Sequence, residues 1–198
     1  MKMPEVIDIA YELKGDALPA GYVFALWPEL VRVLPWLESE EAAGILPVRG
    51  TEKGGAMLLP QRARLLLRMP AEKVQEAQQL SGQTLDVAGH SLKIGAAQLR
   101  PLQAHPTLHA HLVVSEGDES AFLEKARALL SELDIECKMI CGRRVNWTGE
   151  FGSISGYSLV VHELKPEVSL RLQATGLGRE RRFGCGIFVP YKVIAGLE

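Results

Sequence analysis

The spacing of apolar residues along the first half of the chain predicts alternating strands and helices. Residues 6–13 form a strand-like run that ends at Gly15. Large apolar residues at helical spacing follow over 22–37, where Pro28 either begins or kinks the helix and Pro35 ends it. The other elements expected in this half are a strand over 45–49, a turn over 51–56, a strand over 57–69, a helix from Pro70 to Gly82 and one or two strands within 84–94.

The second half repeats this order of elements, beginning with an alternating strand over 108–114. The elements expected after it are a helix over 118–134 capped by Asp118 or Ser120, strands over 135–146 and 154–164, a short helix from Pro166, a glycine-rich loop and a last strand over 187–194. Two consecutive βαββαβ units predict an α+β protein of two tandem ferredoxin-like modules. We place the modules at residues 1–100 and 101–198, joined near 100–106.

The composition is that of a globular protein, because 47% of the 198 residues are hydrophobic and 23% are charged. The formal net charge of -2 gives no overall basic field, so a nucleic-acid partner would require a local basic patch. Charge alone therefore favours a different kind of partner.

Neither the N-terminal segment nor the cysteines indicate secretion, a membrane or a metal. Residues 1–13 lack the basic-then-apolar order of a signal peptide, and no apolar run is long enough to span a membrane. Cys137, Cys141 and Cys185 do not have the spacing of a disulfide framework or a zinc site. We therefore expect a cytoplasmic protein with free thiols, no bound metal and no cofactor.

The sharpest motif is the loop over 176–186, in which two Gly-x-Gly pairs bracket a basic stretch. The pairs are Gly176/Gly178 and Gly184/Gly186, and the arginines between them are Arg179, Arg181 and Arg182. Glycines let the backbone approach a ligand closely, and exposed N–H groups with arginines suit phosphate oxygens. No helix follows and the Gly-Lys-Ser/Thr ending is missing, so the loop matches neither a dinucleotide fingerprint nor a P-loop. From the residues alone, a phosphate site and a plain hairpin with solvated arginines stay equally open.

This loop resembles the C-terminal glycine-rich loop of the RAMP superfamily (repeat-associated mysterious proteins). The superfamily pattern is Gly-apolar-Gly, several residues with a Lys or Arg, then Gly-apolar-Gly, and here Leu177 and Cys185 fill the apolar slots. The loop also lies where that superfamily has it, just before the final strand of the second module. Other segments are similar to the CRISPR repeat-processing branch, the Cas six endoribonucleases, namely residues 82–90, 140–144, 155–159 and 183–192.

The resemblance implies a protein that binds the stem-loop of a CRISPR repeat RNA and cuts it to give guide RNA. In that reaction the ribose 2′-OH attacks the adjacent phosphate, leaving a 2′,3′-cyclic phosphate and a 5′-OH without a metal. Two alternatives stay open. One is a catalytically silent RAMP subunit that holds guide RNA beside the other subunits of an effector complex. The other is an unrelated ferredoxin-like enzyme or regulator that acts on a small molecule.

The first catalytic candidate is Tyr22, which stands about where the family has a histidine, after a Leu-Pro pair early in the first helix. Tyrosine has a pKa near 10 and is a poor base at neutral pH, but it can act as an acid. Lys192 or Arg143 is a basic neighbour that could assist it. The alternative is that Tyr22 only packs at the start of the helix.

The second catalytic candidate is the pair His109 and His111. These residues alternate along one strand and therefore share a face. They act either on RNA or as part of a solvated polar face.

Basic residues gather locally in spite of the acidic total. Arg62, Arg64 and Arg68 fall on one face of the strand predicted over 57–69, opposite its apolar face. Arg143 and Arg144 follow Gly142. A sheet with one basic face can follow a phosphate backbone, so we predict RNA contacts at these positions, with a solvent-facing sheet as the alternative.

Overall fold

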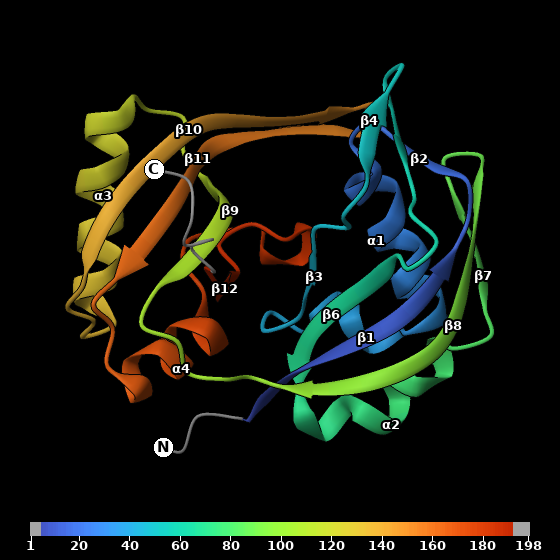
Figure 1. The fold of residues 1–198 in the computed structure, drawn as a ribbon, viewed down its shortest axis with the longest axis horizontal. Coiled ribbons are helices and arrows are strands. Elements are labelled where there is room, and N and C mark those ends of the chain that lie inside the picture. Colours follow the sequence, from blue (N-terminus) through green and yellow to red (C-terminus); the bar gives the residue numbers. More distant parts are fainter. Residues whose placement is uncertain (1–4, 192–198) are drawn as a thin grey trace. The chain divides into compact units, whose positions relative to one another are not determined.

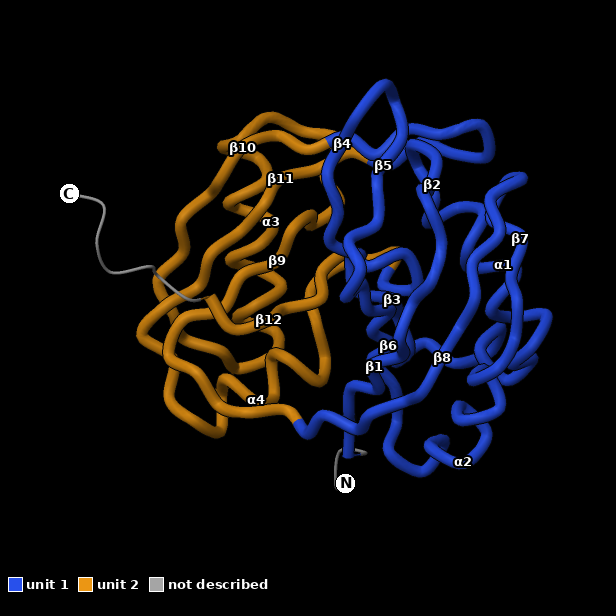
Figure 2. The backbone as a smooth tube through the Cα atoms, turned by 45° about the vertical axis from the view of Figure 1, so that its right-hand side comes forward, with its two compact units in different colours: residues 1–101, 146–154, 181–184 blue, residues 102–145, 155–180, 185–198 orange. Residues whose placement is uncertain are grey.

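The computed structural model describes residues 5–191, which form two compact units (Figures 1 and 2). The first unit contains residues 1–101 together with 146–154 and 181–184, and the second contains the remaining segments of the chain. The first segment of the first unit ends at Pro101. Two short pieces of the second half nevertheless belong to the first unit, and local sequence patterns gave no sign of this.

The first unit is built on a five-stranded antiparallel sheet in the order β3-β6-β1-β8-β7. Its elements are β1 (Val6–Lys14), β2 (Ala17–Pro19), α1 (Tyr22–Val33), η1 (Pro35–Ser39), β3 (Gly44–Leu46), β4 (Thr51–Lys53), β5 (Ala56–Leu58), β6 (Arg64–Pro70), η2 (Ala71–Lys73), α2 (Val74–Ala77), η3 (Gln78–Leu80), β7 (Thr84–Val87) and β8 (His90–Pro101). Strands β2, β5 and β4 form a second, three-stranded sheet. Without β7, the main sheet has the strand order of a ferredoxin-like module.

Several details of the first unit differ from the sequence prediction, among them the helix predicted from Pro70 to Gly82, which is a four-residue α-helix between two 3-10 turns. The strand predicted over 57–69 is divided, because the Ala63 N–H donates to the Pro60 carbonyl at 3.0 Å and closes a turn between β5 and β6. The turn predicted over 51–56 is a short hairpin, β4–β5, with only Gly54 and Gly55 at its tip. Pro28 lies inside α1 and does not begin it.

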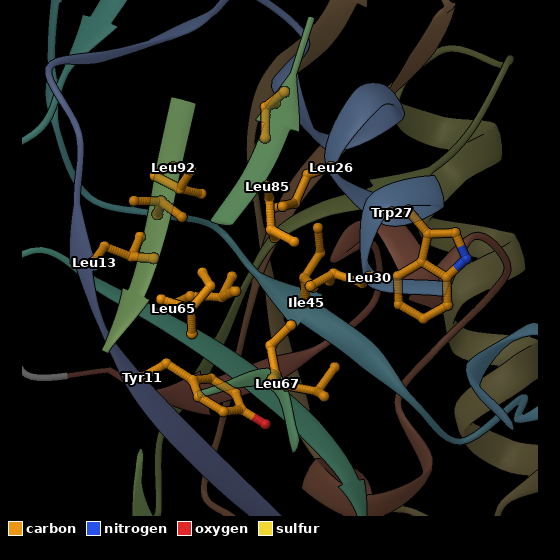
Figure 3. Packing of buried hydrophobic residues seen from close by; sticks show 14 of the residues in the cluster. Tyr11, Leu13, Leu26, Trp27, Leu30, Ile45, Leu65, Leu67, Leu85 and Leu92 are labelled. Atoms are coloured by element: carbon orange, nitrogen blue, oxygen red, sulfur yellow. The ribbon is translucent and has the colours of Figure 1, made fainter. Parts of the chain in front are cut away.

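The core of the first unit lies between α1 and the main sheet. Helix α1 contributes Leu26, Trp27 and Leu30, which belong to one cluster of buried side chains with Leu65 and Leu67 of β6 (Figure 3). Burying each such side chain contributes about 1.5–3 kcal/mol relative to exposure. This packing holds α1 against the sheet, and the candidate site lies at the start of the helix.

The second unit repeats the topology with a four-stranded sheet in the order β10-β11-β9-β12. Its elements are β9 (Leu108–Val114), α3 (Glu119–Glu132), β10 (Lys138–Gly149), β11 (Gly152–His162), α4 (Pro166–Thr175) and β12 (Phe188–Pro190), and η4 (Arg181–Phe183) interrupts the glycine-rich loop. Asp118 caps α3 by accepting from the Ala121 N–H at 2.9 Å. The last strand was predicted over 187–194 and is observed at 188–190. Residues 192–194 of the prediction lie outside the described residues.

The two sheets confirm the predicted fold class, because each has the order second, third, first and fourth strand of a βαββαβ unit. The protein is α+β with two tandem ferredoxin-like modules. Between residues 5 and 191, no helix has both the length and the apolar content that a membrane crossing needs.

Candidate active site

A pocket of about 520 Å³ lies at the start of α1 in the first unit. It is lined by Pro19, Ala20, Gly21, Tyr22, Val23, Pro47, Val48, Glu52, Lys53, Gly54, Gly55, Ala56, Met57 and Trp147. These residues come from the start of α1, the chain after β3, the β4–β5 hairpin and the end of β10. The pocket therefore joins segments that are distant in the sequence.

Two glycines allow the β10–β11 tip to form part of this pocket. Gly21 has φ 64°, and a Cβ there would lie 2.6 Å from the Gly149 Cα. A Cβ on Gly149 would in turn lie 2.9 Å from the Ala20 carbonyl oxygen. This backbone-to-backbone approach brings Trp147 into the pocket wall, where it also packs against the first core. No local pattern indicated the contact, because it joins residues far apart in the chain.

Tyr22 is the sequence-predicted catalytic residue that lines the pocket. Its hydroxyl oxygen accepts a hydrogen bond from the Val48 N–H at 2.8 Å. Burial raises the pKa of Tyr22 to about 12, although the Val48 hydrogen bond acts in the opposite direction. The phenol is therefore protonated at neutral pH, and its chemistry there is that of a proton donor.

The pocket also holds two charged residues that sequence reasoning missed, Glu52 and Lys53 on β4. They were assigned to a turn, and only the pairing of β4 with β5 places them beside the start of α1. A signal was present, because a Gly-Gly pair between two short runs is typical of a tight hairpin. Gly54 and Gly55 have φ 60° and 78°, as such a turn requires.

His109 and His111 lie together on β9 in the second unit, as their alternation predicted. Their ring centroids are 4.8 Å apart, and the Tyr191 ring centroid is 5.6 Å from that of His109. Burial lowers the pKa of His109, which favours its neutral form at pH 7. Neither histidine lines the pocket at Tyr22. Lys192 lies outside the described residues.

The structure contradicts the predicted basic face of the 57–69 segment at Arg68, because an acidic residue of β1 lies opposite this arginine and the pair is buried. The register pairs Asp8 with Arg68 and Glu12 with Arg64. Arg68 is buried and makes two bonds to the Asp8 carboxylate, at 2.7 and 3.0 Å. Arg64 lies 3.4 Å from Glu12, whereas Arg62 is exposed in the turn before β6. Arg68 is thus part of the core and not of a phosphate-binding surface.

The two arginines on β10 are both exposed but differ in their hydrogen bonds. Arg143 is exposed. Arg144 donates to the Gly117 carbonyl at 3.0 Å and to the Tyr157 hydroxyl at 3.1 Å, so it fixes the chain just before α3. Of the two residues, Arg143 therefore remains the better predicted RNA contact.

The arginines of the glycine-rich loop have different surroundings. Arg181 donates from Nε to the Ala42 carbonyl at 2.9 Å, and its other guanidinium nitrogens are buried without a hydrogen-bond partner among the described residues. Burial lowers the pKa of Arg181 to about 10, the nearby Arg68 charge adds to this, and Asp8 opposes it. The buried nitrogens of Arg181 cannot reach RNA in this conformation, which corrects the prediction for that residue.

The remaining two loop arginines are exposed. The Arg179 guanidinium lies 3.0 Å from the exposed Glu116 carboxylate, and that of Arg182 lies 4.6 Å from the Phe183 ring centroid. Exposed ion pairs are weak, so the Glu116 contact would not prevent Arg179 from binding a phosphate.

The four glycines of the loop all have positive φ values, between 65° and 96°. At two of them the protein itself explains the need for glycine. A Cβ on Gly184 would lie 2.6 Å from the Ile45 carbonyl oxygen, and one on Gly186 would overlap the Leu177 carbonyl oxygen. Gly178 is different, because a Cβ there would meet only the Val113 Cγ1 at 3.6 Å.

Comparison with known proteins identifies the family. The family model described as Cas6 Crispr matches residues 7–193. The chain is 34% identical over 188 residues to the CRISPR-associated endonuclease Cas6 of Myxococcus xanthus (strain DK1622), which covers 93% of this chain and 81% of the relative. The chain belongs to the Cas6 family. The family predicted from the glycine-rich loop and its companion segments is thereby confirmed.

Solved structures agree with this family on the fold. A Cas6-related protein from Pyrococcus furiosus has a TM-score of 0.70 at 11% identity, covering 93% of this chain and 98% of that chain. Cse3 of Thermus thermophilus, bound to an RNA that represents a pre-cleavage complex, has a TM-score of 0.54 at 10% identity, covering 93% of this chain and 98% of that chain. At these identities the likeness shows the fold alone.

The two kinds of loop glycine in this Cas6 chain predict different costs of substitution. Gly178→Ala should cost only the strain of a positive φ, about 1–2 kcal/mol of unfolding free energy. Gly184→Ala should cost about 1–3 kcal/mol more, because the new methyl group overlaps the Ile45 carbonyl. Urea unfolding of both variants measures the difference. Equal costs would show that the Ile45 contact does not constrain residue 184.

Proposed function

We propose that this member of the Cas6 family binds the stem-loop of a CRISPR repeat RNA and cuts the precursor to give mature guide RNA. Family membership over residues 7–193, with 34% identity to a Cas6 endonuclease, is the observation that carries the proposal. The pocket at Tyr22 supports it, since it combines a proton donor, an ammonium group and an aromatic wall in one place. The free cysteines suit the reducing cytoplasm, where we propose that the protein acts.

We further propose that the cut is a metal-independent transesterification in this pocket. The 2′-oxygen forms a bond to phosphorus, the bond from phosphorus to the 5′-oxygen breaks, and the 2′-OH proton passes to water. Tyr22 donates its phenolic proton to the leaving 5′-oxygen and later regains one from water. The Val48 N–H, which already donates to the Tyr22 oxygen, stabilises the phenolate formed in between. The Lys53 ammonium offsets charge on the phosphate.

Incubating the pure protein with end-labelled repeat RNA in EDTA tests the proposal. Cleavage to a fragment with a 2′,3′-cyclic phosphate and one with a 5′-OH is expected. Binding without cleavage would favour a catalytically silent RAMP subunit that works with other effector-complex subunits. The tyrosine at the family's histidine position is the observation in favour of that alternative. Absence of salt-dependent RNA binding would favour the small-molecule alternative.

Loss of one exposed loop arginine should change the salt dependence of RNA binding. Arg182→Ala is expected to lower the slope of log affinity against log salt by about 0.7–0.9, the value for one phosphate contact. The same holds for Arg143→Ala, since both residues are exposed. Arg32→Ala is the matched control, because this exposed arginine of α1 pairs with Glu29 and lies outside the proposed RNA contacts. Equal slopes for Arg182→Ala and Arg32→Ala would contradict the role of the loop.

A further inference from the structure

The pocket at the start of α1 has an apolar part that a site for a phosphate group alone would not need. Trp147 and Met57 form an apolar part of its lining, and both pack against the first core. Its volume of about 520 Å³ falls within the range of small-ligand pockets, about 300–1,000 Å³. We propose that the pocket is also a base-recognition site, in which a guanine of the RNA stacks on Trp147 and bonds to Glu52. This inference rests on the proposed RNA cleavage and adds the identity of a base.

Trp147 is suited to stacking because its position is fixed. The close approach of Gly149 to Gly21 holds the end of β10 against the start of α1, and Thr148 bonds to Ser153 across the hairpin at 3.2 Å. A ring that is already held in place loses little freedom when a base stacks on it, which favours binding. Stacking alone accepts any base, because every base has a π face. Selectivity must therefore come from a polar group in the same pocket.

Glu52 is the polar group that we assign to this selection. It pairs with Met57 across the β4–β5 hairpin, so the two side chains leave the same face of the hairpin. Within residues 5–191, Glu52 forms no ion pair and no side-chain hydrogen bond, which leaves both carboxylate oxygens free to accept. An ionised carboxylate accepts hydrogen bonds and donates none.

Guanine is the base that fits two carboxylate oxygens. Its Watson–Crick edge carries two adjacent donors, N1–H and the N2 amino group, which can bond to one carboxylate in parallel. Adenine and cytosine each offer a single amino donor on that edge, beside a ring nitrogen that repels a carboxylate, and uracil offers only N3–H. A site that bonds a substrate N–H discriminates strongly against an analogue without it. Glu52 therefore predicts a preference for guanine.

The first arm of the test measures binding of single nucleotides to the whole protein, with the Trp147 indole N–H signal as the readout. Guanosine monophosphate is expected to shift this signal at lower concentration than the other three ribonucleotides. Inosine monophosphate, which lacks the N2 amino group, should bind about fivefold to tenfold more weakly. Trp147→Phe should retain most of the binding and Trp147→Ala should lose at least tenfold. Trp36→Phe is the matched control, because Trp36 does not line the pocket.

The second arm uses repeat RNA in which inosine replaces each guanosine near the cut, one at a time. One of these substitutions should raise the KM of the wild-type protein about fivefold to tenfold. The same substitution should leave the KM of Glu52→Gln unchanged. The melting temperature of Glu52→Gln is measured first, to show that the variant is folded. Equal response to all four nucleotides, or inosine effects unchanged in Glu52→Gln, would overturn the base site while RNA cleavage stands. Guanine-selective binding by a protein that cuts no repeat RNA would overturn the proposed function and leave the base site.

Discussion

A repeat RNA with a single 2′-deoxyribose on the nucleotide before the cut phosphate is expected to bind normally and to remain intact. The proposed reaction uses the 2′-oxygen of that nucleotide as its nucleophile, so removing the oxygen removes the reaction and not merely a contact. A loss of cleavage below detection is expected, which is the largest effect that any single change to the substrate would have. Electrophoresis of end-labelled RNA measures cleavage, and a filter-binding titration of the same RNA measures affinity.

The matched control places the 2′-deoxyribose on the nucleotide after the cut. That RNA retains the nucleophile and should be cut at nearly the normal rate. Cleavage of the first substrate at the normal rate would refute the mechanism whichever side chains take part, because water or another nucleophile would then be attacking the phosphate.

Tyr22→Phe should slow cleavage by about 10²–10⁴-fold, the usual contribution of a positioned acid or base. The substitution removes the hydroxyl that would protonate the leaving 5′-oxygen, and it leaves the Val48 N–H without its acceptor. Affinity for the 2′-deoxy substrate should hardly change, because the ring that lines the pocket is kept. Single-turnover rates with saturating protein separate this chemical effect from binding.

Tyr11→Phe is the control for a loss of stability. It also removes a buried tyrosine hydroxyl, one that donates to the Ala77 carbonyl at 2.7 Å, but Tyr11 does not line the pocket. It should cost about 1 kcal/mol of unfolding free energy and leave the cleavage rate unchanged. If Tyr22→Phe behaves in the same way, the proton donor is another residue, and His109 and His111 are the next candidates, each tested as alanine.

The raised pKa of Tyr22 also fixes the pH dependence of this effect. With a pKa of about 12, the phenol carries its proton throughout the range from pH 6 to 9. Its donor form is therefore not lost as pH rises through this range, and Tyr22→Phe should lower the rate by a constant factor. If the factor by which Tyr22→Phe lowers the cleavage rate became steadily smaller between pH 7 and 9, Tyr22 would titrate in that range. That result would contradict the effect of burial on its pKa.

The amino-acid sequence by itself determined the main helices and strands of the two ferredoxin-like modules and the family, but not the short strands β2 and β4. These features are local. Apolar spacing distinguishes a strand such as β9 from a helix such as α3, and a cap at Asp118 or Ser120 places the helix start within a few residues of chain. The glycine-rich loop is also one continuous segment, so its pattern could be recognised without knowing what it contacts.

Only the tertiary structure decided which charged residues are available and which residues share the pocket. The register of β1 against β6 buries Arg68 on Asp8, and the packing of residues 181–184 within the first unit buries the Arg181 guanidinium. Alternation along one strand predicts that arginines share a face, but it does not indicate what lies opposite. Trp147 and Glu52 reach Tyr22 through a glycine-to-glycine approach and a strand pairing between distant segments. Such contacts depend on how separate elements pack together, and this information is absent from any short stretch of sequence.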